Sequence, residues 1–183
     1  AGLDSAQLDS VESSLNRAEL YRLIELAVNM ARDPALGLHW CEHLQDSAFN
    51  PITQLIRHAP TLRSGLDTMT KFRSLLSDPP SHELIENKDK VTFRCVDLSS
   101  EPLVVQRFVG EMLVIGFIRL LRDFSPHART RWVGFAYPAP TYAEEYVRVL
   151  GETVQFEQPF TGVVFDSSLD GGIDEFIEAE KGL

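Results

Sequence analysis

The order of extended and helical segments in the last third of the chain restricts its fold more than any other feature. This stretch, Arg131 to Leu169, reads RWVGFAYPAPTYAEEYVRVLGETVQFEQPFTGVVFDSSL. Pro140 and Gly151 stand where a helix would begin and end. The pattern predicts a strand, a helix and two further short strands, in the order Thr130 to Tyr137, Thr141 to Leu150, Glu152 to Glu157 and Thr161 to Asp166.

The N-terminal part of the chain is predicted to form four short helices. Asn16 and Glu19 approximate a capping box, and apolar residues from Leu20 to Ala31 then recur on one helical face. The other three helices follow further capping signals: Asp33-Pro34 for a helix to about Leu44, Asn50-Pro51 for one through Ala59, and Thr61 for one through Leu76. No strand is expected before these helices end.

After Asp78-Pro79-Pro80 the spacing of apolar residues changes from a helical to a strand period, which predicts the beginning of the sheet. Two strands, His82 to Glu86 and Val91 to Val96, flank a turn-rich tetrapeptide and predict a β-hairpin with Phe93 on its apolar face. The long apolar segment Pro102 to Arg122 predicts a helix. These patterns together predict an α+β domain, in which an N-terminal cluster of short helices is followed by a mostly antiparallel sheet with the order β-β-α-β-α-β-β.

Composition restricts the class of protein. The 183 residues, of which 44% are hydrophobic, suit a single domain with one core. The formal net charge is −10, and a strongly acidic surface repels phosphate, so this chain alone is not expected to bind nucleic acid tightly. Two cysteines, Cys41 and Cys95, are too few for a disulfide framework and favour the reducing cytoplasm. The chain begins without signal-peptide features, and charges interrupt its longest apolar segment, so no membrane role is expected.

Three parts of the sequence resemble one protein family: the C-terminal order of elements, the segment Asp33-Pro34-Ala35-Leu36-Gly37-Leu38, and the Leu-rich helix ending near Leu76. They are similar to the N-terminal effector-sensing domain of the AraC-type transcription regulators, in the arabinose-binding branch. The resemblance implies that residues 1–169 form the effector-sensing domain. Residues 170–183 are then an acidic tail or the start of a linker to a helix-turn-helix DNA-binding domain that is missing from this chain.

The resemblance also implies a function and a set of partners. A small-molecule effector would bind this domain, alter its arrangement or dimerisation, and so change how the missing domain engages DNA. The implied protein is a cytoplasmic homodimer without cofactor, enzymatic activity or membrane partner, and it contacts DNA only through the missing domain. The helix Pro102 to Arg122 has more apolar surface than one sheet covers, which also favours a dimer. An amino acid, an organic acid or a lipid fits the effector as well as a sugar.

A different function is suggested by His39-Trp40-Cys41-Glu42-His43, which matches the H-x-x-E-H pattern of the inverted zincin metallopeptidases. This spacing puts two imidazoles on one helical face, so a zinc-dependent hydrolase using His39, Glu42 and His43 is one alternative. The pattern is short and no third ligand accompanies it, so we expect no metal and no catalytic residue. A ligand-free dimerisation or interaction domain is the other alternative.

A small-molecule site needs apolar walls and a few polar groups, and the predicted sheet and long helix offer both. Arg107 and Glu111 lie four residues apart on one helical face, so they either pair with each other or meet a polar ligand. Strand alternation puts Phe135 and Tyr137 on one face of the sheet and Trp132 on the other. The ligand site is therefore predicted between the long helix and the sheet, with Arg107, Glu111, Phe135, Tyr137 and Phe93 as its residues.

Overall fold

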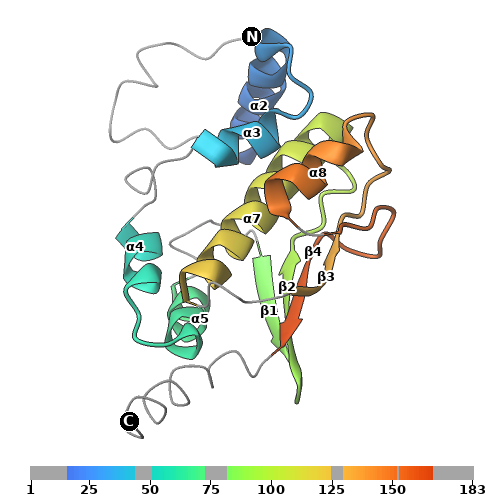
Figure 1. The fold of residues 1–183 in the computed structure, drawn as a ribbon. Coiled ribbons are helices and arrows are strands. Elements are labelled where there is room, and N and C mark those ends of the chain that lie inside the picture. The colour runs from blue at the N-terminus through green and yellow to red at the C-terminus, as the bar shows by residue number, and fades with distance from the viewer. Residues whose placement is uncertain (1–15, 44–50, 73–81, 125–129, 152, 167–183) are drawn as a thin grey trace, which may run out of the picture.

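Helices precede the sheet along the chain, and one long helix then packs across the sheet (Figure 1). The structure is a computed structural model that describes residues 16–43, 51–72, 82–124, 130–151 and 153–166. Its elements are α2 (Arg17–Ala31), α3 (Leu36–His43), α4 (Pro51–Arg57), α5 (Leu62–Lys71), β1 (His82–Glu86), β2 (Lys90–Cys95), α7 (Leu103–Phe124), β3 (Thr130–Gly134), α8 (Ala143–Leu150) and β4 (Gly162–Asp166). The predicted α+β class, with helices ahead of an antiparallel sheet, is confirmed.

Four antiparallel strands form the sheet in the spatial order β1-β2-β4-β3. The predicted hairpin is formed by β1 and β2, and β4 lies between β2 and β3, where Val163 is opposite Phe93 on one side and Val133 on the other. The face that carries these three residues is buried under helices. Trp132 is only partly buried and packs against Phe160, with ring centroids 4.9 Å apart.

The chain between α8 and β4 differs from the prediction of a strand at Glu152 to Glu157. Residue 152 lies outside the described part, and the rest of the segment pairs through a single parallel bridge between Gln155 and Gly134. Glu157 has a left-handed backbone (φ 57°), which interrupts an extended strand, and its N–H donates to the carbonyl oxygen of Tyr137 (3.1 Å). β3 accordingly ends at Gly134 rather than at Tyr137, because the residues after it hydrogen-bond to this irregular segment.

The predicted long helix, α7, is the centre of the core. One side of it lies on β2 and β4, and α2, α3 and α4 pack against other sides (Figure 1). Val114, Ile118 and Leu121 are at most 2% exposed. Other helices of the same chain therefore cover the apolar surface that the sheet leaves open, so this surface is no longer a reason to expect a dimer. No described helix, α7 included, combines the length and apolarity that crossing a bilayer requires.

Local signals set the helix ends. The side chain of Asn16 accepts the N–H of Glu19 (3.0 Å), and the Glu19 carboxylate accepts the N–H of Asn16 (2.9 Å), which completes the predicted capping box. Thr61 caps α5, and Gly151 ends α8 with a φ of 67°, a conformation that favours glycine.

α3 begins slightly later than predicted. The Asp33 carboxylate accepts the N–H of Ala35 (2.9 Å) in a turn that contains Pro34, and the helix itself starts at Leu36. The predicted helix ends at residues 44 and 76 lie outside the described part of the chain.

Candidate functional site

A carboxyl group lies in the middle of the hydrophobic core. Glu111 on α7 has no exposed surface, and its Oε1 accepts hydrogen bonds from the hydroxyls of Tyr146 (2.5 Å) and Tyr142 (3.2 Å). Its other oxygen, Oε2, has no hydrogen-bond partner among the described residues. A buried polar atom without a partner destabilises a fold by about 1–3 kcal/mol, so its presence calls for an explanation.

Burial raises the pKa of the Glu111 carboxyl to about 7, because the low-dielectric core disfavours the charged form. The two tyrosine hydroxyls, the positive charge of Arg107 and the nearby N–H of Leu38 all act to lower that pKa. The Leu38 N–H itself donates to the carbonyl of Ala35 (3.0 Å), so it favours the carboxylate without giving Oε2 a well-formed hydrogen bond. The carboxyl is therefore close to half ionised near neutral pH.

Aromatic rings surround this carboxyl. The hydroxyl oxygens of Tyr137 and Tyr146 are 3.3 Å apart, and the ring of Tyr146 meets that of Phe135 edge-on, with centroids 5.0 Å apart. Phe156 packs against all three rings, at centroid distances between 5.1 and 6.4 Å. The structure thus brings together three of the predicted site residues: Glu111, Phe135 and Tyr137.

The other two predicted site residues, Arg107 and Phe93, have different neighbours. The guanidinium of Arg107 lies over the ring of Tyr142, 5.9 Å from its centroid, and its buried Nε has no hydrogen-bond partner within the described residues. Phe93 belongs to the same core, but its ring stacks on Phe117 (4.1 Å) and His82 (5.1 Å) rather than on the tyrosines. Arg107 therefore lies at the edge of the cluster, and Phe93 lies beside it.

Sequence reasoning missed Tyr142, Tyr146 and Gly37. The two tyrosines are four residues apart, a spacing that brings side chains to one helical face, and this signal was available. Gly37 allows α3 to lie directly on the carboxyl, because a Cβ atom at this position would be 2.2 Å from Oε2 of Glu111 and 3.0 Å from the Cα of Phe108. No sequence pattern marks that close approach.

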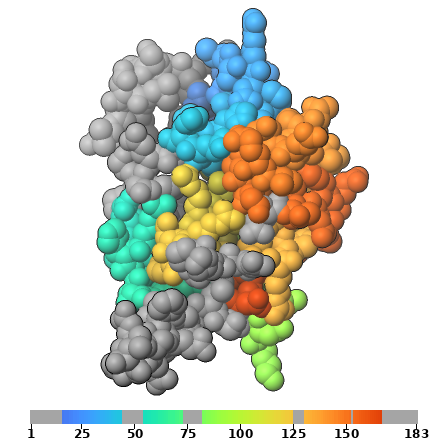
Figure 2. Space-filling model, viewed as in Figure 1, coloured from blue at the N-terminus to red at the C-terminus, as the bar shows by residue number. Residues whose placement is uncertain are grey.

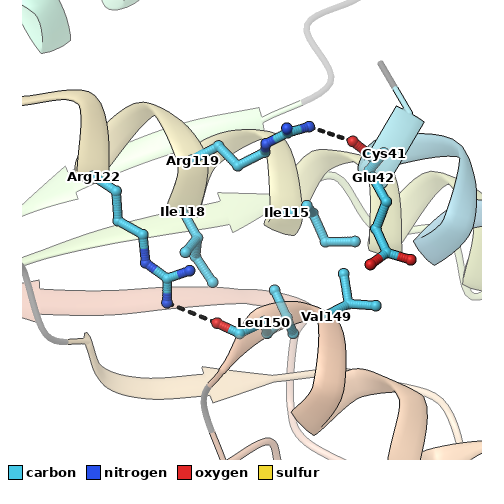
Figure 3. Close-up of a pocket in the computed structure, with 8 residues that line it drawn as sticks. All are labelled: Cys41, Glu42, Ile115, Ile118, Arg119, Arg122, Val149 and Leu150. Carbon is cyan, nitrogen blue, oxygen red and sulfur yellow. Dashed lines mark hydrogen bonds between the residues drawn. The ribbon is translucent and has the colours of Figure 1, made fainter. Parts of the chain in front are cut away.

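A separate hollow of about 130 Å³ lies further along α7, where α3 and α8 end (Figure 3). Its lining does not include the five predicted site residues. Apolar side chains from α7 and α8 contribute part of the lining, and charged side chains contribute the rest. The lining includes Ile115, Ile118, Val149, Arg119, Arg122 and Glu42.

Comparison with known proteins decides the family. Residues 1–169 match the family described as the arabinose-binding domain of AraC transcription regulator, N-term. The chain belongs to this family. One curated relative is the ornithine utilization regulator of Pseudomonas aeruginosa, which is 29% identical over 156 residues, or 84% of this chain and 45% of the relative. This arabinose-binding-type AraC domain therefore spans less than half the length of that relative.

In this AraC-type domain the H-x-x-E-H residues join two helices. The ring nitrogens of His39 on α3 lie 2.6 Å from a carboxylate oxygen of Asp33 and 3.3 Å from one of Glu145 on α8. The hydrogen bond with Asp33 is the main cause of a raised His39 pKa. Glu42 bonds to both terminal nitrogens of Arg148 on α8 (2.8 and 2.7 Å). These contacts give the pattern a role in holding α3 against α8, and no metal-binding group of three or more His, Cys, Asp or Glu occurs in the part of the chain that the structure describes.

Proposed function

We propose that this chain is the ligand-sensing N-terminal domain of an AraC-type transcription regulator. A small-molecule effector binds here and changes how a C-terminal helix-turn-helix domain, outside this chain, engages DNA in the cytoplasm. The proposal depends on Glu111. Its carboxyl is fully buried, and one carboxyl oxygen has no hydrogen-bond partner among the described residues. Such a group destabilises the fold. Buried polar groups without hydrogen-bond partners occur mainly at functional sites, where those groups are used.

The proposed ligand-contacting residues are Arg107, Glu111, Phe135, Tyr137 and Phe93. Arg107 Nε and Glu111 Oε2 are both buried without a partner in the described part of the chain, and one polar ligand would satisfy both. Tyr142 contacts both residues, since its hydroxyl donates to Glu111 and its ring lies under the Arg107 guanidinium. Because Tyr142 is only partly buried, a rotation of this side chain opens a route to the carboxyl.

An effector acts on such a domain only if it prefers one of its conformations, because equal affinity for two states shifts neither. The state described has the carboxyl closed under α3 and α8, so an effector that bonds to Glu111 favours an arrangement in which Tyr142 has moved. The name of the curated relative concerns ornithine utilization, and ornithine carries ammonium groups that an ionised carboxylate binds well. Ornithine and related amines and acids are therefore the first effectors to test.

A thermal-shift screen of metabolites tests the sensor. We expect at least one compound to raise the melting temperature saturably, because it binds only the folded domain. For that compound, Glu111→Gln and Tyr137→Phe should each weaken binding by about tenfold, since each removes a polar contact. Arg63→Gln, on the exposed surface of α5, is the control and should bind like the parent. Undiminished binding by both site variants would refute the contacts, and a screen without any hit would favour the ligand-free dimerisation domain.

This chain alone should not bind duplex DNA specifically at physiological salt, whereas the full-length regulator should. The net charge of −10 opposes contact with phosphates, which supply most of the affinity of non-specific DNA binding. Fluorescence anisotropy with DNA from the protein's own promoter measures this directly. Nanomolar, sequence-dependent binding by this chain in isolation would contradict the proposal.

Dimerisation through this domain completes the proposal. Three large apolar side chains of α2 remain exposed and offer a surface for a second copy: Leu20 (43%), Leu26 (43%) and Met30 (83%). We expect sedimentation equilibrium at micromolar concentrations to show a dimer, and Met30→Glu to shift it toward monomer. A strict monomer at high concentration would exclude dimerisation through this domain.

A further inference from the structure

Two arginines belong to the lining of the hollow beside α7. Arg119 and Arg122 face it together with Glu42 (Figure 3). The Glu42 carboxylate already bonds to both terminal nitrogens of Arg148, at 2.8 and 2.7 Å, so its negative charge is matched outside the hollow. Arg119 and Arg122 thus bring guanidinium N–H donors to the hollow, and such donors suit an anion.

Each of the two arginines connects the end of a helix to α7. Arg119 donates to the carbonyl oxygen of Cys41 near the end of α3, and Arg122 donates to that of Leu150, the last residue of α8 (2.7 Å) (Figure 3). A guanidinium carries five N–H donors in a planar fork, and the bond to Cys41 uses one of those of Arg119. The other N–H groups of Arg119 are available to a ligand while its hydrogen bond to Cys41 still holds α3.

The size and the apolar part of the hollow limit its occupant. Its volume of about 130 Å³ is smaller than the several hundred Å³ of a site for a drug-sized ligand. Ile115 and Ile118, both at most 3% exposed, and the partly buried Val149 contribute the apolar lining. A small molecule with an aliphatic part and one anionic end fits this combination. A carboxylate is the anion that matches a guanidinium in two parallel hydrogen bonds on the scale of an amino acid.

We infer that this hollow binds the carboxylate of a small aliphatic acid, of amino-acid size or less, through the remaining N–H donors of Arg119, with Arg122 beside it. The inference rests on the proposed sensor function and names the chemical class of its effector. The hollow continues the Glu111 region along α7, since Ile115 is one helical turn from Glu111 on the same face. Burial raises the pKa of the intervening Cys41 thiol to about 12, with Arg119 lowering it and Glu111 raising it, so both charges act at this point.

Ligand binding at this place acts on the helices that cover Glu111. A carboxylate in the hollow contacts the same side chains that hold the ends of α3 and α8 to α7. Those two helices are also joined to each other through Glu42 and Arg148. A change at the hollow therefore shifts both helices relative to α7, which is the kind of two-state element that a sensor requires.

A matched set of compounds tests the inference by isothermal titration calorimetry at constant ionic strength. L-Ornithine, 5-aminopentanoate and butanoate carry the carboxylate, whereas putrescine is ornithine without it. We expect the carboxylates to bind at millimolar concentrations or better and putrescine to bind at least about tenfold more weakly. Arg119→Gln keeps a donor for Cys41 but loses the charge, and it should weaken carboxylate binding by about tenfold or more. Arg63→Gln is the matched control and should bind as the parent does.

The location of binding is checked independently of any variant. Butanoate should shift the methyl resonances of Ile115 and Ile118 in nuclear magnetic resonance spectra of the unaltered domain, which keeps the test valid if Arg119→Gln does not fold. Equal affinity for putrescine and ornithine, unshifted isoleucine methyls at saturation, or no binding by any carboxylate would overturn the inference. If a metabolite raises the melting temperature of the parent and of Arg119→Gln equally, this inference fails while the proposed sensor function is retained. If carboxylates bind here without altering DNA binding by the full-length protein, the carboxylate site is retained while the proposed sensor function fails.

Discussion

Replacing Glu111 with glutamine is expected to abolish most of the loss of stability that this domain undergoes as the pH rises from about 4.5 to about 7. The carboxyl has its usual pKa of 4.5 in the unfolded chain and a pKa of about 7 in the core. Between these values the folded protein holds a proton that the unfolded protein has released, so the free energy of unfolding falls with rising pH. At 1.36 kcal/mol per pKa unit, the loss amounts to about 3 kcal/mol. Glutamine mimics the protonated form and does not titrate.

Urea unfolding of both proteins at about pH 5 and about pH 8 measures this effect. His39 contributes stability that is present at low pH and lost as the pH rises through its raised folded pKa. Glu42 and Glu145, whose pKa values are lowered mainly by Arg148, contribute stability that is lost only as the pH falls. These groups are common to both proteins, so the difference between them isolates residue 111.

The tyrosines that face Glu111 do not titrate in this range. Burial raises the pKa values of Tyr137, Tyr142 and Tyr146, so their hydroxyls stay protonated. An identical pH dependence in the parent and in Glu111→Gln would mean that the buried carboxyl is ionised throughout, and that its surroundings solvate charge far better than the contacts indicate.

Gly37→Ala should destabilise the domain by about 1–3 kcal/mol, although alanine is the better helix former. The new methyl group would be 2.2 Å from Oε2 of Glu111, which Tyr146 holds in place, so the carboxyl cannot easily move aside. It would also be 3.0 Å from the Cα of Phe108 and 3.1 Å from the Cβ of Glu111. Those atoms belong to the body of α7, so α3 itself has to shift.

Gly116→Ala is the matched control for this substitution. Gly116 also lies inside a helix, but a Cβ atom there meets nothing within 4 Å apart from the neighbouring helical turns. It should stabilise the domain by about 0.5–1 kcal/mol, because alanine loses less backbone freedom on folding. Chemical denaturation of both variants compares the two effects. A stabilised Gly37→Ala protein would show that α3 does not lie tightly on the carboxyl.

The elements that the sequence predicts well are those fixed by neighbouring residues. The Asn16 cap, the hairpin around residues 87–90 and the glycine at the end of α8 each depend on local geometry, and the structure has all three. The irregular segment before β4 was predicted as a strand because nothing marks Glu157 for a left-handed backbone, which few residues other than glycine and asparagine adopt.

The candidate site was only partly accessible from sequence. A charge within an apolar helix singled out Glu111, and strand alternation placed Phe135 and Tyr137 on its side of the sheet. The partner of that charge is Tyr146, which is 35 residues away along the chain. No periodicity within either helix predicts such a pairing, because it depends on how α8 returns across α7. The hollow was missed for the same reason, since three separate helices supply its lining.

The contact between α3 and α8 joins residues 106 positions apart, so it also orders events during synthesis. α8 is the last helix described along the chain, and it brings Tyr146 to Glu111. Until α8 has been synthesised and has packed on α7, the carboxyl lacks its hydrogen bond from Tyr146 and the cover of that helix. Enclosure then requires uptake of about half a proton near neutral pH. Closure of α8 over this carboxyl is thus coupled to proton uptake, and a lower pH favours the closed domain.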